Sequence, residues 1–106
     1  MKPRNRSSVI QMIKKEMPHL RQQFGVEHLA VYGSFARDEA DQESDIDLIV
    51  SLSRPLGFKF IQLADYLEEK LGRKVDLITA STLEYGRGDP RRAHIAKDIE
   101  ESLVYV

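Results

Sequence analysis

Two aspartates, Asp45 and Asp47, lie two residues apart inside the otherwise apolar run SDIDLIV. Side chains two apart on a β-strand point to the same face, separated by roughly 6–7 Å along the strand. Two neighbouring carboxylates on a half-buried strand repel each other and lose hydration, so they require a cation or several hydrogen-bond donors. The alternative, that both acids lie solvated at a strand edge, explains a single acid more readily than this pair.

The sequence Gly33-Ser34 precedes the two acids. A glycine lets backbone N–H groups approach a phosphate closely, and a serine hydroxyl can donate to it. Mg²⁺ is usually held by one or two carboxylates together with phosphate oxygens, and two such ions about 3.5–4 Å apart can clamp a phosphoryl transfer. The stretch from Tyr32 to Val50 therefore predicts a site for a metal-bound polyphosphate. Arg37 follows the turn and can pair bidentately with phosphates, with an ordinary surface position as the alternative.

A third acid, Asp76, lies in the apolar run KVDLIT. Neighbouring strands are about 5 Å apart, so Asp76 can approach Asp45 and Asp47 if the two strands pair. We therefore expect three carboxylates in one pocket.

The order of these residues resembles a known signature. Gly33-Ser34, ten intervening residues and then Asp45-Ile46-Asp47 with apolar neighbours are similar to the DNA polymerase β-like nucleotidyltransferases. The form GSFAR…SDIDLIV is most similar to the minimal nucleotidyltransferases, many of which are antitoxins paired with HEPN-domain toxins. One departure is Asp38, because the family usually has glycine there. Aspartate tolerates a left-handed backbone better than most residues, so the turn can survive.

The resemblance implies roles for six residues. In the family, the matching carboxylates hold two metal ions, and one of these carboxylates can act as the base toward the attacking hydroxyl. The turn binds the nucleotide. Carried onto this chain, the catalytic and metal-binding residues are Asp45, Asp47 and Asp76, and the nucleotide-binding residues are Gly33, Ser34 and Arg37.

The implied activity is Mg²⁺-dependent transfer of a nucleoside monophosphate. With ATP as donor and two Mg²⁺ ions, AMP would pass to a hydroxyl of a partner protein, such as a tyrosine of a HEPN toxin, and silence it. Two alternatives stay open. One is a non-catalytic antitoxin that neutralises its toxin by forming a complex, and the other is a subunit of a small-molecule (antibiotic) nucleotidyltransferase.

Composition bounds the remaining possibilities. The 106 residues suit a single domain spanning 1–106, so we expect the acceptor to come from a partner in a hetero-oligomer. The 16 basic and 17 acidic residues give a net charge of −1, which provides no bulk basicity for direct nucleic-acid binding. Cysteine is absent, which excludes disulfides and thiolate chemistry. No run approaches the ~20 apolar residues of a membrane helix, so we expect a cytoplasmic protein.

Apolar spacing places these residues on a small mixed α/β fold. A first helix, capped by Ser7 or Ser8, is expected to break or kink near Met17 because Pro18 removes a donor and clashes with the preceding turn. Gly25 is the expected helix end. Strands are predicted over 28–33, 45–52 and 75–79, and helices over 58–71 and 91–103.

The helix over 58–71 is expected to end at Gly72 and to bury Phe60 or Ile61, Ala64, Leu67 and Leu71. The aromatic residues Tyr32, Phe35, Phe58 and Phe60 are assigned to core or turn packing. A short, twisted mixed sheet flanked by helices on one face would then leave the three aspartates on the open face.

Overall fold

A computed structural model describes residues 3–80 and 102–106. The final helix expected over 91–103 lies almost wholly outside these residues. The described elements form a four-stranded sheet of order β3-β2-β1-β4, with two long helices and one short one. Their bounds are α1 (Arg6–Phe24), β1 (Val26–Tyr32), α2 (Gly33–Ala36), β2 (Ile46–Leu52), α3 (Lys59–Leu71), β3 (Val75–Thr79) and β4 (Val104–Tyr105).

The N-cap of the first helix, α1, lies two or three residues before the predicted one. Its N-cap is Asn5, whose side-chain oxygen accepts from the Ser8 backbone N–H at 2.9 Å, so the assignment of the cap to Ser7 or Ser8 was wrong. Asparagine is as good a cap as serine, and only the backbone path decides between neighbouring candidates. The buried stripe follows the predicted spacing and consists of Val9, Ile13, Met17, Leu20 and Phe24.

Of the predicted break or kink near Met17, the break was wrong, because α1 runs through Pro18 without interruption. Pro18 is exposed, so the carbonyl that loses its helical partner lies on the water-facing side. An internal proline costs about 3 kcal/mol. Burying Leu20 and Phe24 beyond it contributes roughly 1.5–3 kcal/mol each, which offsets that cost. The helix then ends as predicted at Gly25, whose φ of 67° is left-handed.

The sheet is mixed, as predicted. β1 pairs antiparallel with β2, and β2 pairs in parallel with β3 after the chain returns through α3. The sequence did not predict β4, a two-residue strand that pairs antiparallel with the free side of β1.

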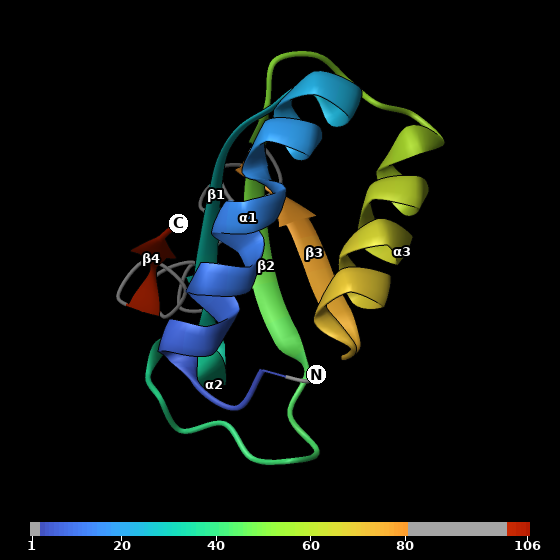
Figure 1. The fold of residues 1–106 in the computed structure, drawn as a ribbon. Helices are drawn as coiled ribbons and strands as arrows, with labels where there is room; N and C mark the ends of the chain where they lie inside the picture. The colour runs from blue at the N-terminus through green and yellow to red at the C-terminus, as the bar shows by residue number, and fades with distance from the viewer. Residues whose placement is uncertain (1–2, 81–101) are drawn as a thin grey trace, which may run out of the picture.

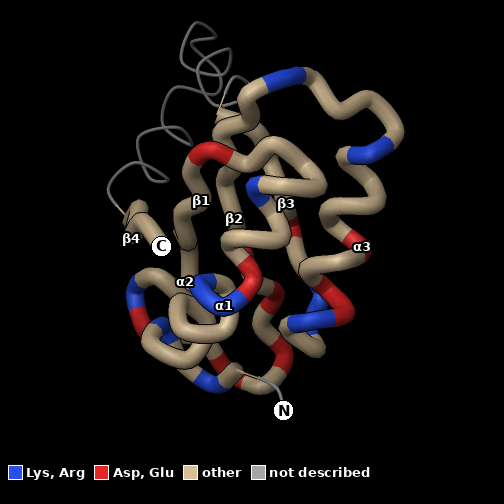
Figure 2. Tube along the Cα trace, turned by 45° about the horizontal axis from the view of Figure 1, so that its top comes forward, with Lys and Arg blue, Asp and Glu red and all other residues tan. Residues whose placement is uncertain are grey.

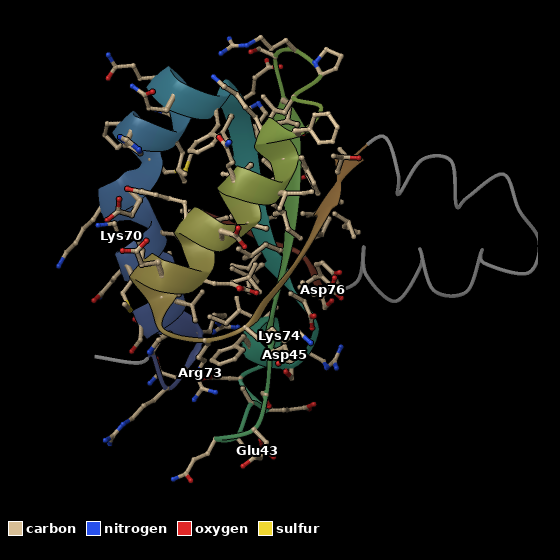
Figure 3. All side chains as sticks on the ribbon, turned by 90° about the vertical axis from the view of Figure 1, so that its right-hand side faces the viewer. Glu43, Asp45, Lys70, Arg73, Lys74 and Asp76 are labelled. Carbon is tan, nitrogen blue, oxygen red and sulfur yellow. The ribbon has the colours of Figure 1, made fainter. Side chains whose placement is uncertain are left out.

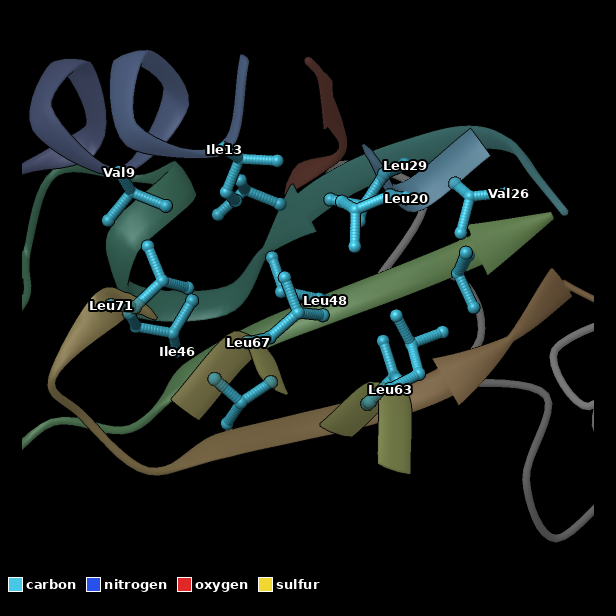
Figure 4. Packing of buried hydrophobic residues seen from close by; sticks show 14 of the residues in the cluster. Val9, Ile13, Leu20, Val26, Leu29, Ile46, Leu48, Leu63, Leu67 and Leu71 are labelled. Atoms are coloured by element: carbon cyan, nitrogen blue, oxygen red, sulfur yellow. The ribbon is translucent and has the colours of Figure 1, made fainter. Parts of the chain in front are cut away.

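Helices α1 and α3 lie side by side on one face of the sheet (Figure 1). Their buried side chains meet those of β1 and β2 in one apolar core, which Figure 4 shows with Ile13 and Leu20 from α1, Leu29 and Leu48 from the sheet and Leu67 from α3.

The buried stripe of α3 differs in part from the prediction. It consists of Leu63, Leu67 and Leu71, and Leu63 was missed. The alternative Ile61 was wrong, since this side chain is 62% exposed, whereas Phe60 packs against the core. The helix ends at Gly72 in the left-handed conformation, as predicted.

The other face of the sheet carries a smaller apolar cluster. Ala30 and Ile49 are its buried members, with Tyr32, Ile78 and Leu103 packed against them. Acidic and basic positions are interleaved along the described chain, as expected from the near-zero net charge (Figure 2). Within residues 3–80 and 102–106, none of the helices has the length and apolar character needed to cross a bilayer.

Candidate active site

The strand register brings the predicted acids together. Asp47 of β2 stands directly opposite Asp76 of β3, and on its other side opposite Tyr32 of β1. Residues directly opposite each other in a sheet share one face. Asp45 comes immediately before β2, and Figure 3 shows Asp45 and Asp76 on the side of the sheet away from α1 and α3. The structure therefore places Asp47 beside Asp76 on the open face, as predicted, with Asp45 just ahead of the same strand.

The charges of the neighbouring acids and of Arg37 all act on Asp47. Burial raises the pKa of this carboxyl above its ordinary value of 3.8, and the negative charges of Asp76 and Asp45 raise it further, while Arg37 lowers it. Like charges held this close are unfavourable without a positive counter-charge. A bound cation would therefore stabilise the ionised form of this group.

Gly33 is required by two separate features of the site. Its φ of 73° is left-handed, which disfavours any residue with a side chain. A Cβ at this position would also collide with the Asp47 carboxylate, at Oδ2 and then at Cγ. The glycine that begins the short helix α2 therefore leaves the space that the carboxylate occupies.

The C-terminal segment also reaches this turn. The Gly33 N–H donates to the Ser102 hydroxyl at 3.2 Å, across 69 positions of sequence. Sequence reasoning missed Ser102, and no local pattern around it points to a site. Ser34 is half-buried in α2, and its carbonyl accepts from the Glu39 N–H at 2.8 Å.

Arg37 lies close enough to influence the acids, but its side chain is exposed. It forms an ion pair with Glu39 at 3.3 Å, with half of the arginine side chain in water. An exposed pair of this kind is worth at most about 1 kcal/mol, so Arg37 can exchange Glu39 for another anion at little cost.

Asp38, at the position where glycine was expected, adopts the conformation a glycine would. Its φ is 61°, the one positive value among the described non-glycine residues. Its carboxylate accepts from the Arg6 backbone N–H at 3.1 Å, and the Arg6 guanidinium donates to the Ala36 carbonyl at the same distance. The charge of Asp38 is thus directed to the start of α1.

Tyr32 belongs to the site as well as to the packing predicted for it. Burial, and then the charges of Asp76 and Asp47, raise its pKa to about 12, so the phenol stays protonated. Phe35 is fully buried as predicted, whereas Phe58 is 89% exposed in the turn before α3.

The donor set fits Mg²⁺. Carboxylate oxygens are its preferred protein ligands, and Asp45, Asp47 and Asp76 would hold it. Within the described part of the chain, no group of three or more aspartate, glutamate, histidine or cysteine side chains is placed to hold a metal ion, so the three carboxylates do not surround one ion position as the sequence led us to expect. One or two carboxylates completed by substrate phosphates is the usual arrangement for this ion, and this open group suits it.

Comparison with known proteins identifies the family. The sequence profile of the nucleotidyltransferase domain matches residues 10–106. The chain belongs to the nucleotidyltransferase domain family. It is 41% identical over 100 residues to the protein adenylyltransferase MntA of Thermococcus cleftensis, covering 93% of this chain and 90% of that protein.

Two solved structures share the fold. One, provisionally described as a minimal nucleotidyltransferase, superposes with a TM-score of 0.66 at 24% identity and covers 94% of both chains. The other is a mutant of the MntA-HpeT toxin-antitoxin, with a TM-score of 0.58 at 18% identity, covering 96% of this chain and 71% of that one. The mixed sheet with its helices is therefore the minimal nucleotidyltransferase fold, as the sequence predicted.

Proposed function

We propose that this nucleotidyltransferase is a protein adenylyltransferase that acts as an antitoxin. It would transfer AMP from ATP to a hydroxyl of a partner protein, namely a tyrosine of a HEPN toxin, and so silence that toxin in the cytoplasm. The observation that carries the proposal is the register that sets Asp47 opposite Asp76, with Gly33 directly against the Asp47 carboxylate and Asp45 just ahead of the strand. The name of the Thermococcus relative supports a protein as acceptor.

In the proposed reaction the acceptor oxygen attacks the α-phosphorus of ATP. An oxygen–phosphorus bond forms, the bond to the bridging oxygen breaks, and pyrophosphate leaves. Asp76 would take the proton of the attacking hydroxyl, directly or through a bound water. Two Mg²⁺ ions, held by Asp45, Asp47 and Asp76, would neutralise the phosphate charge when bound.

The turn would hold the triphosphate. Gly33 lets the backbone pass close to Asp47, so phosphates bound at this turn would lie beside the metal-binding carboxylates. Ser34 would donate its hydroxyl to a phosphate oxygen. Arg37 would release Glu39 and pair with the triphosphate, since its exposed pair with Glu39 is weak and a guanidinium can bind a phosphate bidentately.

The test uses the purified chain, Mg²⁺, ATP labelled at the α-phosphate and the HEPN protein proposed as its partner. We expect the HEPN protein to gain the mass of one adenylyl group on a tyrosine. The double variant Asp45→Asn, Asp47→Asn should lose both transfer and neutralisation of toxicity. Asp65→Asn is the matched control, because Asp65 is an exposed acid of α3, which packs on the other face of the sheet.

The outcomes separate the alternatives. Neutralisation by the double variant without transfer would show a binding antitoxin, and label on an added aminoglycoside instead of on protein would show a small-molecule enzyme. Either result would refute the proposed function.

A further inference from the structure

Arg73 lies in the turn between α3 and β3 and holds two distant segments together. Its Nε donates to the Pro3 carbonyl at 3.0 Å, and its Nη1 donates to the carbonyls of Gln42 and Ser44 at 3.1 and 3.0 Å. All three acceptors belong to the main chain. Figure 3 shows Arg73 at the foot of α3, at the same end of the sheet as Asp45 and Glu43.

The contact with Ser44 reaches directly to an acid of the site. The Ser44 carbonyl and the Asp45 nitrogen belong to one peptide group, which is planar. A hydrogen bond that fixes this carbonyl therefore also fixes the plane that carries the Asp45 Cα. Asp45 is exposed and precedes β2, so the strand ladder begins one residue too late to hold it.

The same guanidinium supports the phosphate-binding turn. Its Cζ lies 5.2 Å from the centre of the Phe35 ring, which is fully buried and follows Ser34 in α2. A planar cation over an aromatic face is attracted by it and packs against it. Arg73 thus contacts a residue next to each half of the site, Phe35 directly after Ser34 and Ser44 directly before Asp45.

The loop between these halves depends on such support. Within it, the Asp41 N–H donates to the Ser44 hydroxyl at 2.9 Å, and the Glu43 N–H donates to the Asp41 carboxylate at 2.8 Å. These bonds shape the loop but do not attach it to the sheet. Arg73 supplies that attachment from the side of β3, the strand that carries Asp76.

We infer that Arg73 is a positioning residue, which sets Asp45 and the Phe35 turn in the geometry that binds the metal-bound nucleotide. The nucleotide and metal part of this inference rests on the proposed function. Lysine is a poor substitute, because a single ammonium cannot reproduce a planar fork with Nε on one carbonyl and Nη1 on two others. Methionine keeps the stem and removes every donor.

The first measurement is independent of catalysis. Amide hydrogen exchange of residues 41–45 is compared in the wild type, Arg73→Met, Arg73→Lys and the control Lys15→Met, which removes an exposed cation of α1. We expect exchange about tenfold faster in Arg73→Met, an intermediate rate in Arg73→Lys and no change in Lys15→Met. Unchanged exchange in Arg73→Met would overturn the inference even if adenylyl transfer is observed.

The second measurement separates positioning from general stability. At a temperature where every variant is folded, the Mg²⁺ concentration for half-maximal AMP transfer, or for half-maximal binding of a non-hydrolysable ATP analogue, should rise about 10–100-fold in Arg73→Met. Arg73→Lys should recover part of this loss. If the melting temperature falls while the Mg²⁺ requirement stays within twofold, Arg73 is only structural and the inference fails. If the wild type binds the analogue but transfers nothing, the proposed function fails, and the binding series still decides the role of Arg73.

Discussion

Replacement of Gly33 by alanine is the most direct test of the geometry at the site, and Gly57 offers a matched control. Both glycines have a left-handed backbone, with φ of 73° and 57°. A Cβ at Gly57 would meet no atom within 4 Å, whereas a Cβ at Gly33 would collide with the Asp47 carboxylate. The two variants therefore share the backbone strain and differ in the collision.

The loss of unfolding free energy that comes from the left-handed backbone can be estimated for both variants. Left-handed conformation costs a non-glycine residue roughly 1–2 kcal/mol, and the loss of glycine's freedom in the unfolded chain returns about 0.4–1 kcal/mol. Each variant should therefore lose about 1 kcal/mol of unfolding free energy, or roughly 4–8 °C in melting temperature for a domain of this size. Gly33→Ala should lose about 0.5–1.5 kcal/mol more, because Asp47 is forced from its rotamer.

The effect of Gly33→Ala on AMP transfer should be larger than its effect on stability. A displacement of about 1 Å in a catalytic group can cost on the order of 100-fold in rate. We expect Gly33→Ala to lose AMP transfer by about that factor and Gly57→Ala to keep it, measured by label transfer below both melting temperatures. Equal stability losses in the two variants, with activity retained in Gly33→Ala, would refute the reasoning.

The remaining predictions concern charge, the loop and the core. Without metal, Asp47→Asn should raise the melting temperature at pH 7, because burial and like charges raise the pKa of Asp47 and its ionised form destabilises the fold. This gain should shrink as the pH falls toward 3.8 and Asp47 becomes protonated in the folded state. Asp38→Ala should lose roughly 1–2 kcal/mol in urea unfolding, because it combines left-handed strain with loss of the Arg6 contact, whereas Asp38→Asn should stay within about 0.5 kcal/mol. Leu67→Ala should cost about 2–5 kcal/mol because Leu67 is fully buried, and exposed Ile61→Ala less than about 0.5 kcal/mol.

Each of these has a result that contradicts it. A lower melting temperature for Asp47→Asn at pH 7 without metal would mean that its carboxylate is compensated within the fold. Equal losses for Asp38→Ala and Asp38→Asn would remove the role of the Arg6 contact. Equal losses of unfolding free energy for Leu67→Ala and Ile61→Ala would mean that the buried face of α3 was assigned incorrectly.

Local spacing was enough to predict much of the fold. Apolar periods of two and of three to four residues separate strands from helices, and glycines at helix ends mark where α1 and α3 stop. The prediction failed where a local conformational preference competes with tertiary packing. Pro18 opposes a helix locally, but the buried side chains on both sides of it keep α1 continuous.

The sequence by itself also predicted that Asp45 and Asp47 share a face, from the alternation of side chains along a strand. The strand begins only at Ile46, however, so its ladder holds Asp47 and not Asp45. The sequence could not determine the register of β3, since a shift of one residue would turn Asp76 to the other face. The register in the folded sheet sets Asp76 directly opposite Asp47.

Only the tertiary structure decided which residues support these acids. The collision that excludes a side chain at Gly33, the hydroxyl of Ser102 on its N–H and the hold of Arg73 on the Ser44 carbonyl all join segments about 14 to 69 residues apart. Such contacts depend on where the chain returns in space. Sequence spacing encodes the direction of a side chain along one element, and packing between elements decides what that side chain meets.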